Sequence, residues 1–359
     1  MIPDIEPTER PPDYLHRIGT VFAQFGGDTQ DSGNISYGVK LGDTRYFVKT
    51  AGDPAHTTPA LTHQERVALL HTAARLASTI EHPTLPKYHG TIESVDGPML
   101  VYNWSDGEHL GAHQSARDDP ATAFQRFRAL PVPEILQALD LIYDLHGELT
   151  RAGWVAGDFY DGALMYDFTT SRLTVMDLDS YQLGAYRNNM GRMFGSSRFM
   201  APEEYQLGAL IDQRTTLFVM ARTALVLLSD GSLDRAPFRG TDAQYAVLRR
   251  ATASAPSDRY PTYSSFHHAW LAAHRRRPDR TRGQGDAHLC APASHRHEPR
   301  LIKRCTKPTD RWPGRSCAAA GDDLGTAGGG RSGTAGGDRG GPCQPGGFVH
   351  RSVTSGRTG

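Results

Sequence analysis

Three residues that are charged at neutral pH stand at the ends of short apolar segments, where a fold can hold a charge against its core. Lys49 ends an apolar strand and is one of only three lysines among the first 274 residues. Asp158 precedes and Asp177 follows a predicted β-hairpin within residues 164–176, so the two carboxylates can meet at its open end. An ammonium group can neutralise phosphate, and carboxylates can bind a metal ion or accept a proton. Alternatively, both aspartates serve only as turn residues.

The order of several motifs around these residues resembles that of the protein kinase family over residues 14–273. Asp158 takes the place of the catalytic Asp in the family's catalytic loop, and Asp177 takes the place of the metal-binding Asp of the Asp-Phe-Gly motif. Residues 201–203 reproduce Ala-Pro-Glu, and Arg259 resembles the late arginine that pairs with the glutamate of that motif. Together these matches imply a protein-kinase-like fold.

Hydrophobic periodicity fits such a fold. Short β-rich runs predict strands at 20–24, 37–41, 45–49, 85–91 and 99–103, and longer apolar or amphipathic runs predict helices at 61–80, 133–151 and 215–228. We therefore expect an α+β, bilobal protein-kinase-like fold with a small antiparallel-sheet N-lobe, a mainly helical C-lobe and a disordered C-terminal tail. The expected parts are an N-terminal extension (1–13), the N-lobe (14–104), the C-lobe (105–274) and the tail (275–359).

The resemblance implies an ATP site between the two lobes. The Gly-rich loop 25–36 lacks the family's regular glycine spacing and is better compared with the serine-bearing loops of small-molecule phosphotransferases of the same fold. Lys49 is expected to pair with the phosphates and with Glu65 of the following helix. The backbone of residues 103–105 is expected to hydrogen-bond the adenine edge. The implied nucleotide-binding residues are Ser32, Gly33, Asn34, Lys49, Glu65, Asn103 and Trp104.

The expected metal ligands depart from the family pattern. Ala163 stands where the family has the Asn that binds a second metal ion. Asp161 is close enough in sequence to substitute for it, and Asp179 adds a carboxylate beside Asp177. Because Mg²⁺ prefers oxygen ligands and keeps several waters, we expect Mg²⁺ or Mn²⁺ at Asp177, Asp179 and Asp161.

The resemblance implies an ATP-dependent protein serine/threonine kinase, with ATP and a protein substrate as its partners. Asp158 would accept the proton of the substrate hydroxyl, and Lys49 would act on the phosphates. A pseudokinase that binds nucleotide or serves as a scaffold is the first alternative, favoured by the missing Asn and the irregular glycine loop. A small-molecule phosphotransferase is the second, favoured by Ser32-Gly33-Asn34 and the Asp-x-Asp sequence. Nothing in the sequence indicates the oligomeric state.

Composition argues against several other classes of protein. The chain has a formal net charge of +0, but residues 275–359 carry 16 basic and 7 acidic side chains, so the part that precedes them is acidic. An acidic folded part is not expected to bind specific nucleic acids. No apolar run approaches the roughly 20 residues that a membrane helix needs, and all four cysteines lie after residue 289. We therefore expect a cytoplasmic protein with no membrane segment.

We expect deletion of residues 275–359 to leave a folded, nucleotide-binding protein, because this segment has no apolar periodicity with which to join a core. The melting temperature and ATP affinity of the truncated and full-length proteins should agree. A drop of many degrees on truncation would show instead that the segment packs against the rest of the chain.

Overall fold

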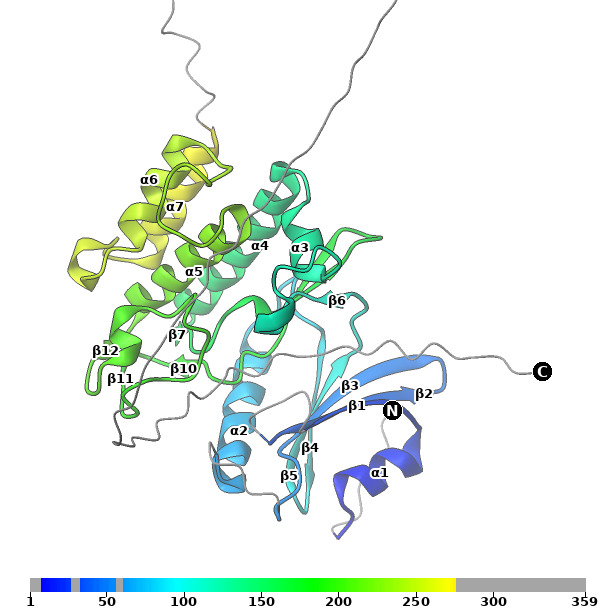
Figure 1. Ribbon diagram of the computed structural model, residues 1–359. Helices are drawn as coiled ribbons and strands as arrows, with labels where there is room; N and C mark the ends of the chain where they lie inside the picture. The colour runs from blue at the N-terminus through cyan, green and yellow to red at the C-terminus, as the bar shows by residue number, and fades with distance from the viewer. Residues whose placement is uncertain (1–7, 27–32, 56–60, 276–359) are drawn as a thin grey trace, which may run out of the picture. The chain divides into compact units, whose positions relative to one another are not determined.

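The computed structural model describes residues 8–26, 33–55 and 61–275 (Figure 1). These residues form an α+β structure with an antiparallel sheet in the first third of the chain and helices in the remainder. The expected tail after residue 275, residues 1–7 of the expected extension and Ser32 lie outside the described residues. Within the described ranges, no helix has the length and apolar content needed to cross a bilayer.

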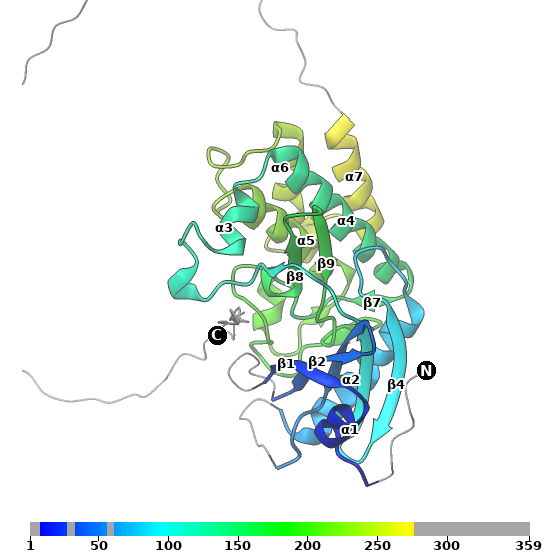
Figure 2. The same ribbon diagram turned by 90° about the vertical axis from the view of Figure 1, so that its right-hand side faces the viewer.

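The sheet contains five antiparallel strands in the order β1-β2-β3-β5-β4 (Figures 1 and 2). The strands are β1 (Thr20–Phe25), β2 (Ile35–Leu41), β3 (Thr44–Thr50), β4 (Tyr88–Ser94) and β5 (Gly97–Asn103). Five strands were predicted at these places, although β4 begins three residues later than expected. Gly42 permits the tight β2–β3 turn because its φ of 60° lies in the left-handed region.

Alternation along the strands gives the sheet two different faces. Tyr37 pairs with Val48, and both belong to an apolar cluster on one face. Lys49 pairs with Leu100 and therefore faces the other side, where Leu100 packs in a second cluster. The register thus directs Lys49 to the face that helix α2 covers.

One helix packs on each face of the sheet. Helix α1 (Pro11–Ile18) buries Tyr14 and Leu15 in the cluster that contains Tyr37, although the sequence suggested only an extension up to residue 13. Helix α2 (His63–Thr79) buries Leu70 in the cluster on the opposite face. The end of α2 is within one residue of the prediction, and its start is two residues later.

The remaining described residues form a mainly helical part around one large apolar core. Its helices are α3 (Ala123–Arg128), α4 (Val132–Arg151), α5 (Gln213–Leu228), α6 (Asp242–Ala251) and α7 (Tyr263–Arg275). It also contains three small sheets. One has three strands in the order β6-β8-β9: β6 (Glu108–His109), β8 (Leu164–Asp167) and β9 (Arg172–Val175). The other two have two strands each: β7 (Trp154–Val155) with β10 (Gln182–Leu183), and β11 (Tyr186–Arg187) with β12 (Leu210–Ile211). The predicted hairpin and the predicted helices at 133–151 and 215–228 are confirmed.

Helix α5 is the central element of this core, because nearly all of its residues are buried. The carboxylate of Asp212 caps its N-terminus by accepting the Arg214 backbone N–H at 2.7 Å. The Thr216 hydroxyl accepts the Ala156 backbone N–H at 3.1 Å, which ties α5 to the loop that carries Asp158. A largely buried helix therefore supports the backbone of the candidate catalytic loop.

A buried ion pair connects two segments that are 56 residues apart in sequence. The Arg259 guanidinium donates to both Glu203 carboxylate oxygens, at 2.6 and 2.8 Å, and it also donates to the backbone carbonyls of Ala253, Ser254 and Arg214. Both charged side chains are almost completely buried. The predicted bidentate pair is therefore confirmed, and its hydrogen bonds offset the cost of burying the charges.

Arg259→Met should lower the free energy of unfolding by about 3–5 kcal/mol, because it leaves the Glu203 carboxylate buried without its cation. Arg249→Met, on the exposed side of α6, is the matched control and should change stability little. Chemical denaturation of both variants measures the difference. Equal stabilities would mean that the buried pair contributes nothing beyond packing.

Candidate functional site

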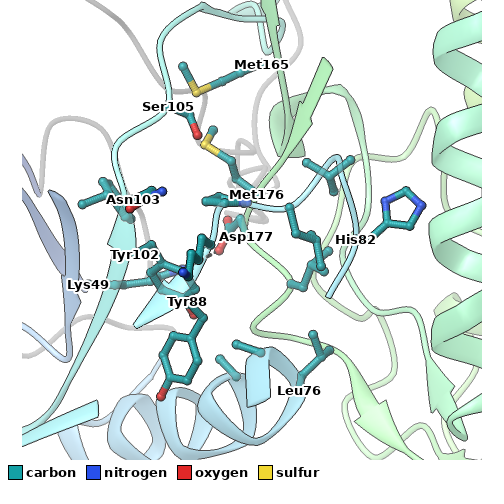
Figure 3. A pocket seen from close by; sticks show the side chains of 18 of the residues that line it. Lys49, Leu76, His82, Tyr88, Tyr102, Asn103, Ser105, Met165, Met176 and Asp177 are labelled. Atoms are coloured by element: carbon teal, nitrogen blue, oxygen red, sulfur yellow. Dashed lines mark hydrogen bonds and ion pairs between the residues drawn. The ribbon is translucent and has the colours of Figure 1, made fainter. Parts of the chain in front are cut away.

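A cavity of 620 Å³ opens on the α2-covered face of the sheet, next to the β8–β9 hairpin. Its polar lining includes Lys49 and the carboxylates of Asp177 and Asp179. Figure 3 shows Lys49, Tyr102 and Asp177 directed toward one another, with Met165 and Met176 on the side where Ser105 lies. The cavity therefore combines a charged region with an apolar one.

Lys49 forms ion pairs with two carboxylates from one short segment. Its Nζ lies 2.6 Å from Asp177 Oδ1, and it also contacts Asp179 Oδ2. The Lys49 side chain is 10% exposed, whereas that of Asp177 is 43% exposed. The lysine is thus covered, and one of its two carboxylates remains open to solvent.

The three charges perturb one another's pKa values. Burial alone would lower the pKa of Lys49, but the two carboxylates outweigh burial and hold the pKa above its usual range. Burial acts to raise the pKa of Asp177, yet the Lys49 ammonium outweighs it and leaves the pKa lowered. For Asp179, burial and the charge of Asp177 raise the pKa despite Lys49. Asp177 is therefore the more firmly ionised carboxylate.

Glu65 does not pair with Lys49, contrary to the expectation. Its carboxylate accepts the backbone N–H and the hydroxyl of Thr62, each at 2.7 Å, and forms a capping box at the start of α2. The residues of α2 that line the cavity are Ala73, Leu76 and Ala77. Because none of these α2 residues is acidic, Lys49 takes both of its carboxylate partners from the 177–179 segment.

Asp158 lies in the loop after β7, and several contacts hold this loop in place. A Cβ at Gly157 would collide with the Ser180 carbonyl oxygen, so the glycine permits close approach to the 177–180 segment. On the other side, Phe159 is buried and its ring packs edge-on against His146 of α4 at 4.7 Å. The backbone at Asp158 has a φ of 52°, a left-handed conformation that aspartate tolerates better than most residues.

The Asp158 carboxylate has an unsatisfied oxygen. Its Oδ1 is buried and, within the described part of the chain, accepts no hydrogen bond. Burial raises the pKa of Asp158 to about 8, and the negative charges of Asp177 and Glu204 add to the shift. A buried acceptor with a pKa close to neutral is suited to taking up a proton.

Asp161 is engaged elsewhere and is not placed as a metal ligand. It is 2% exposed and forms an ion pair with the Arg198 guanidinium. Among the described residues there is also no group of three or more His, Cys, Asp or Glu side chains that could hold a metal ion. The structure therefore brings together two of the three expected ligands, Asp177 and Asp179. The third, Asp161, is paired with an arginine instead.

The segment expected to contact adenine lines the cavity at Asn103, Trp104 and Ser105. The backbone N–H of Asn103 donates to Lys87 O at 2.8 Å, and that of Trp104 donates to Arg45 O at 3.1 Å. Ser105, in contrast, has no backbone hydrogen bond within the described part of the chain. Within the predicted segment 103–105, the backbone N–H groups of Asn103 and Trp104 are therefore engaged, and among the described residues that of Ser105 is free.

The glycine loop is only partly described. Ser32 lies outside the described residues, and Gly33 and Asn34 are not among the residues that line the cavity. The Gly33 carbonyl oxygen lies so close to Gly52 that a Cβ there would collide with it. Gly33 and Gly52 therefore lie in close contact just beyond the end of β3.

Two bulky side chains that border the cavity were not predicted. Phe47 lines it from β3, and Met165 lines it from β8. Phe47 could have been found from the sequence, because it stands two residues before Lys49 on the same strand face. Met165 depends on how the hairpin lies against the sheet, and no local pattern indicates this.

No protein-family model and no curated protein matches this chain.

Asp158→Asn should stabilise the protein more at high pH than at low pH. With an unfolded-state pKa of about 3.9 and a folded-state pKa of about 8, the folded protein retains a proton that the unfolded chain has released. As the pH rises from about 3.9 to about 8, the contribution of Asp158 to the free energy of unfolding therefore falls. Asparagine does not titrate, so the variant does not lose this stability. The melting temperature of the variant relative to wild type should be higher at about pH 9 than at about pH 5. A pH-independent difference would contradict the perturbed carboxyl.

Proposed function

We propose that this protein has a bilobal kinase-like fold, binds Mg·ATP in the cavity and transfers the γ-phosphoryl group to the hydroxyl of a protein serine or threonine. The observation that carries this proposal is the pairing of Lys49 with two carboxylates at the cavity, beside the loop that carries Asp158. Lys49 is paired with Asp177 and Asp179, and Asp158 presents an unsatisfied carboxylate oxygen beside the same segment. Phosphoryl transfer requires mainly positioning and charge neutralisation, which these groups can supply.

The apolar region of the cavity has the chemistry that a purine ring requires. Phe47 and Met165 offer apolar surface from two different elements, and Ser105 offers free backbone hydrogen-bonding groups at the edge. A small number of polar groups in a mainly apolar lining is typical of nucleotide pockets. ATP bound here would place its base near Ser105 and its phosphates near Lys49.

The donor set at Asp177 and Asp179 fits Mg²⁺ or Mn²⁺. Both ions prefer oxygen ligands, and Mg²⁺ is commonly held by one or two carboxylates together with substrate phosphates. When bound, the ion would neutralise charge on the phosphates. The open carboxylate of Asp177 is the better placed of the two, because its side chain is 43% exposed and its pKa is lowered.

Asp158 would bind the substrate hydroxyl that accepts the phosphoryl group. It would hold the substrate hydroxyl and accept its proton as the oxygen forms a bond to the γ-phosphorus and the bond between that phosphorus and ADP breaks. Lys49 would meanwhile balance charge on the remaining phosphates. Because burial raises the pKa of Asp158 to about 8, this step should become faster as the pH approaches that value.

A polypeptide acceptor is favoured by the surface that follows the 177–179 segment. Several large apolar side chains are exposed there: Leu183, Met190, Phe194, Tyr205, Leu207 and Leu210. A concentration of exposed apolar side chains in one stretch of the chain is compatible with a protein-binding surface. Use of ATP also agrees with the cytoplasmic location expected from the sequence.

A nucleotide-binding module without turnover is the second candidate. Two observations favour it: Asp161 is paired with Arg198, and Ala163 leaves the family's second ligand position empty of donors. Such a module would still bind Mg·ATP through Lys49 and Asp177. Only a test that separates binding from transfer distinguishes the two candidates.

Asp158→Asn should leave Mg·ATP binding near the wild-type value and lower transfer by about 10²–10⁴-fold, as expected for a lost general base. Asp177→Asn should weaken Mg²⁺-dependent binding as well as transfer. Asp43→Asn, in the β2–β3 turn, is the matched control and should change neither. Nucleotide-induced stabilisation measures binding, and labelled ATP with a generic protein measures transfer.

Two results would argue against this assignment. Binding of Mg·ATP by the wild type without any transfer would favour the module without turnover. Unchanged binding and transfer in both aspartate variants would mean that these carboxylates are turn residues.

A further inference from the structure

Four arginine side chains gather beside the loop that carries Asp158. Arg117 precedes α3, Arg128 ends α3, Arg198 lies just before residues 201–203 and Arg222 belongs to α5, which contacts α3 (Figure 2). The Arg222 Nε donates to the Arg198 carbonyl at 2.7 Å, and the Arg198 guanidinium lies over the Phe124 ring of α3 at 5.5 Å. The stretch from Arg117 to Arg128, the loop at Arg198 and helix α5 thus contribute positive charge to one place.

This cluster has more positive than negative charge. Asp161 pairs with Arg198, but neither Asp118 nor Asp230 forms an ion pair with any of the four arginines in the described part of the chain. Burial lowers the pKa of Arg117 and Arg222, and the nearby charge of Arg198 lowers both further. Like charges held together at partly buried positions create a positive potential that attracts anions.

The arginines also hold unused hydrogen-bond donors. The Nε–H groups of Arg117, Arg128 and Arg198 are buried and have no partner among the described residues. No hydrogen bond or ion pair of any kind involves the Arg117 side chain within that part of the chain. Buried guanidinium donors are normally satisfied, so these three N–H groups are available to an acceptor that is not part of the described residues.

The cluster borders the position at which the acceptor hydroxyl would lie. Asp161, the partner of Arg198, is three residues after Asp158. A Cβ at Gly195, three residues before Arg198, would lie 3.4 Å from Asp158 Oδ1. A residue close to the phosphorylated serine or threonine could therefore reach the arginines.

We propose that Arg117, Arg128, Arg198 and Arg222 form an anion subsite that selects protein substrates with an acidic group near the accepting hydroxyl. This inference rests on the proposed kinase function. The shared chemistry is an anion with several oxygen acceptors, provided by an aspartate or glutamate or by a residue that is already phosphorylated. Guanidinium groups match both in geometry, because their donors form a planar fork.

The test measures binding of fluorescent peptides to the full chain, with Mg·ADP present so that no turnover is needed. Four peptides share one serine in a neutral sequence and differ only nearby, where they carry alanine, aspartate, phosphoserine or arginine. The aspartate peptide should bind about 10-fold more tightly than the alanine peptide, and the phosphoserine peptide more tightly still. The arginine peptide should bind most weakly, and added salt should reduce the differences.

Arg117→Gln should abolish most of this preference, whereas Arg117→Lys should retain part of it through charge alone. Among the described residues the Arg117 side chain forms no hydrogen bond or ion pair, so both variants should fold, and melting temperatures check this. Arg172→Gln, on the exposed β8–β9 hairpin, is the matched control and should keep the full preference. Arg198→Gln is a poor choice because it would leave Asp161 buried without its cation.

The outcomes separate this inference from the proposed function. Acid-selective, Arg117-dependent binding without phosphoryl transfer from Mg·ATP would uphold the subsite and overturn the kinase activity. Transfer to serine peptides without an acidic preference, or with a preference that survives Arg117→Gln, would overturn the subsite and leave the kinase activity standing. Displacement by free phosphate with no selectivity among the peptides, or no measurable peptide binding, would also overturn the subsite.

Discussion

The contact on which the candidate site depends is the ion pairing of Lys49 with Asp177 and Asp179, because it joins the sheet to the segment after the β8–β9 hairpin. Two carboxylates this close would repel each other strongly if no cation lay between them. Lys49 is the cation, and the β3–β5 register turns it toward the cavity together with Tyr102. The pairing of β3 with β5 therefore determines which charge faces the two aspartates that follow the β8–β9 hairpin.

Much of this arrangement could be predicted, and the failures have physical causes. The scarcity of lysines and the apolar strand before Lys49 identified it, and the hairpin at 164–176 placed Asp158 and Asp177 at one end. Glu65 was assigned wrongly because a local signal, the capping box with Thr62, prevailed over a partner expected at long range. The pairing of Asp161 with Arg198 joins residues 37 apart in sequence, and no periodicity reports such a contact.

The helical part supports the site through polar contacts made inside an apolar core. The Thr216 hydroxyl of the buried helix α5 holds the Ala156 backbone, and the Arg259–Glu203 pair anchors the 201–203 segment. Short helices were the hardest elements to foresee: α3 has six residues, too few for apolar periodicity to show. Yet α3 carries Arg128 and Phe124 beside Arg198, so an element that the sequence barely indicates contributes to the surface near Asp158.

Both carboxylates that neutralise Lys49 belong to one three-residue stretch, whose first residue, Asp177, has a φ of 58°. Non-glycine residues hold this left-handed conformation only where their surroundings stabilise it. Leu178, between the two aspartates, is buried in the large apolar core, and its carbonyl accepts the Tyr181 N–H, so core packing fixes the position from which both carboxylates reach Lys49. The electrostatics of the cavity therefore depend on core packing, because a change that displaces Leu178 would weaken both ion pairs of Lys49 at once.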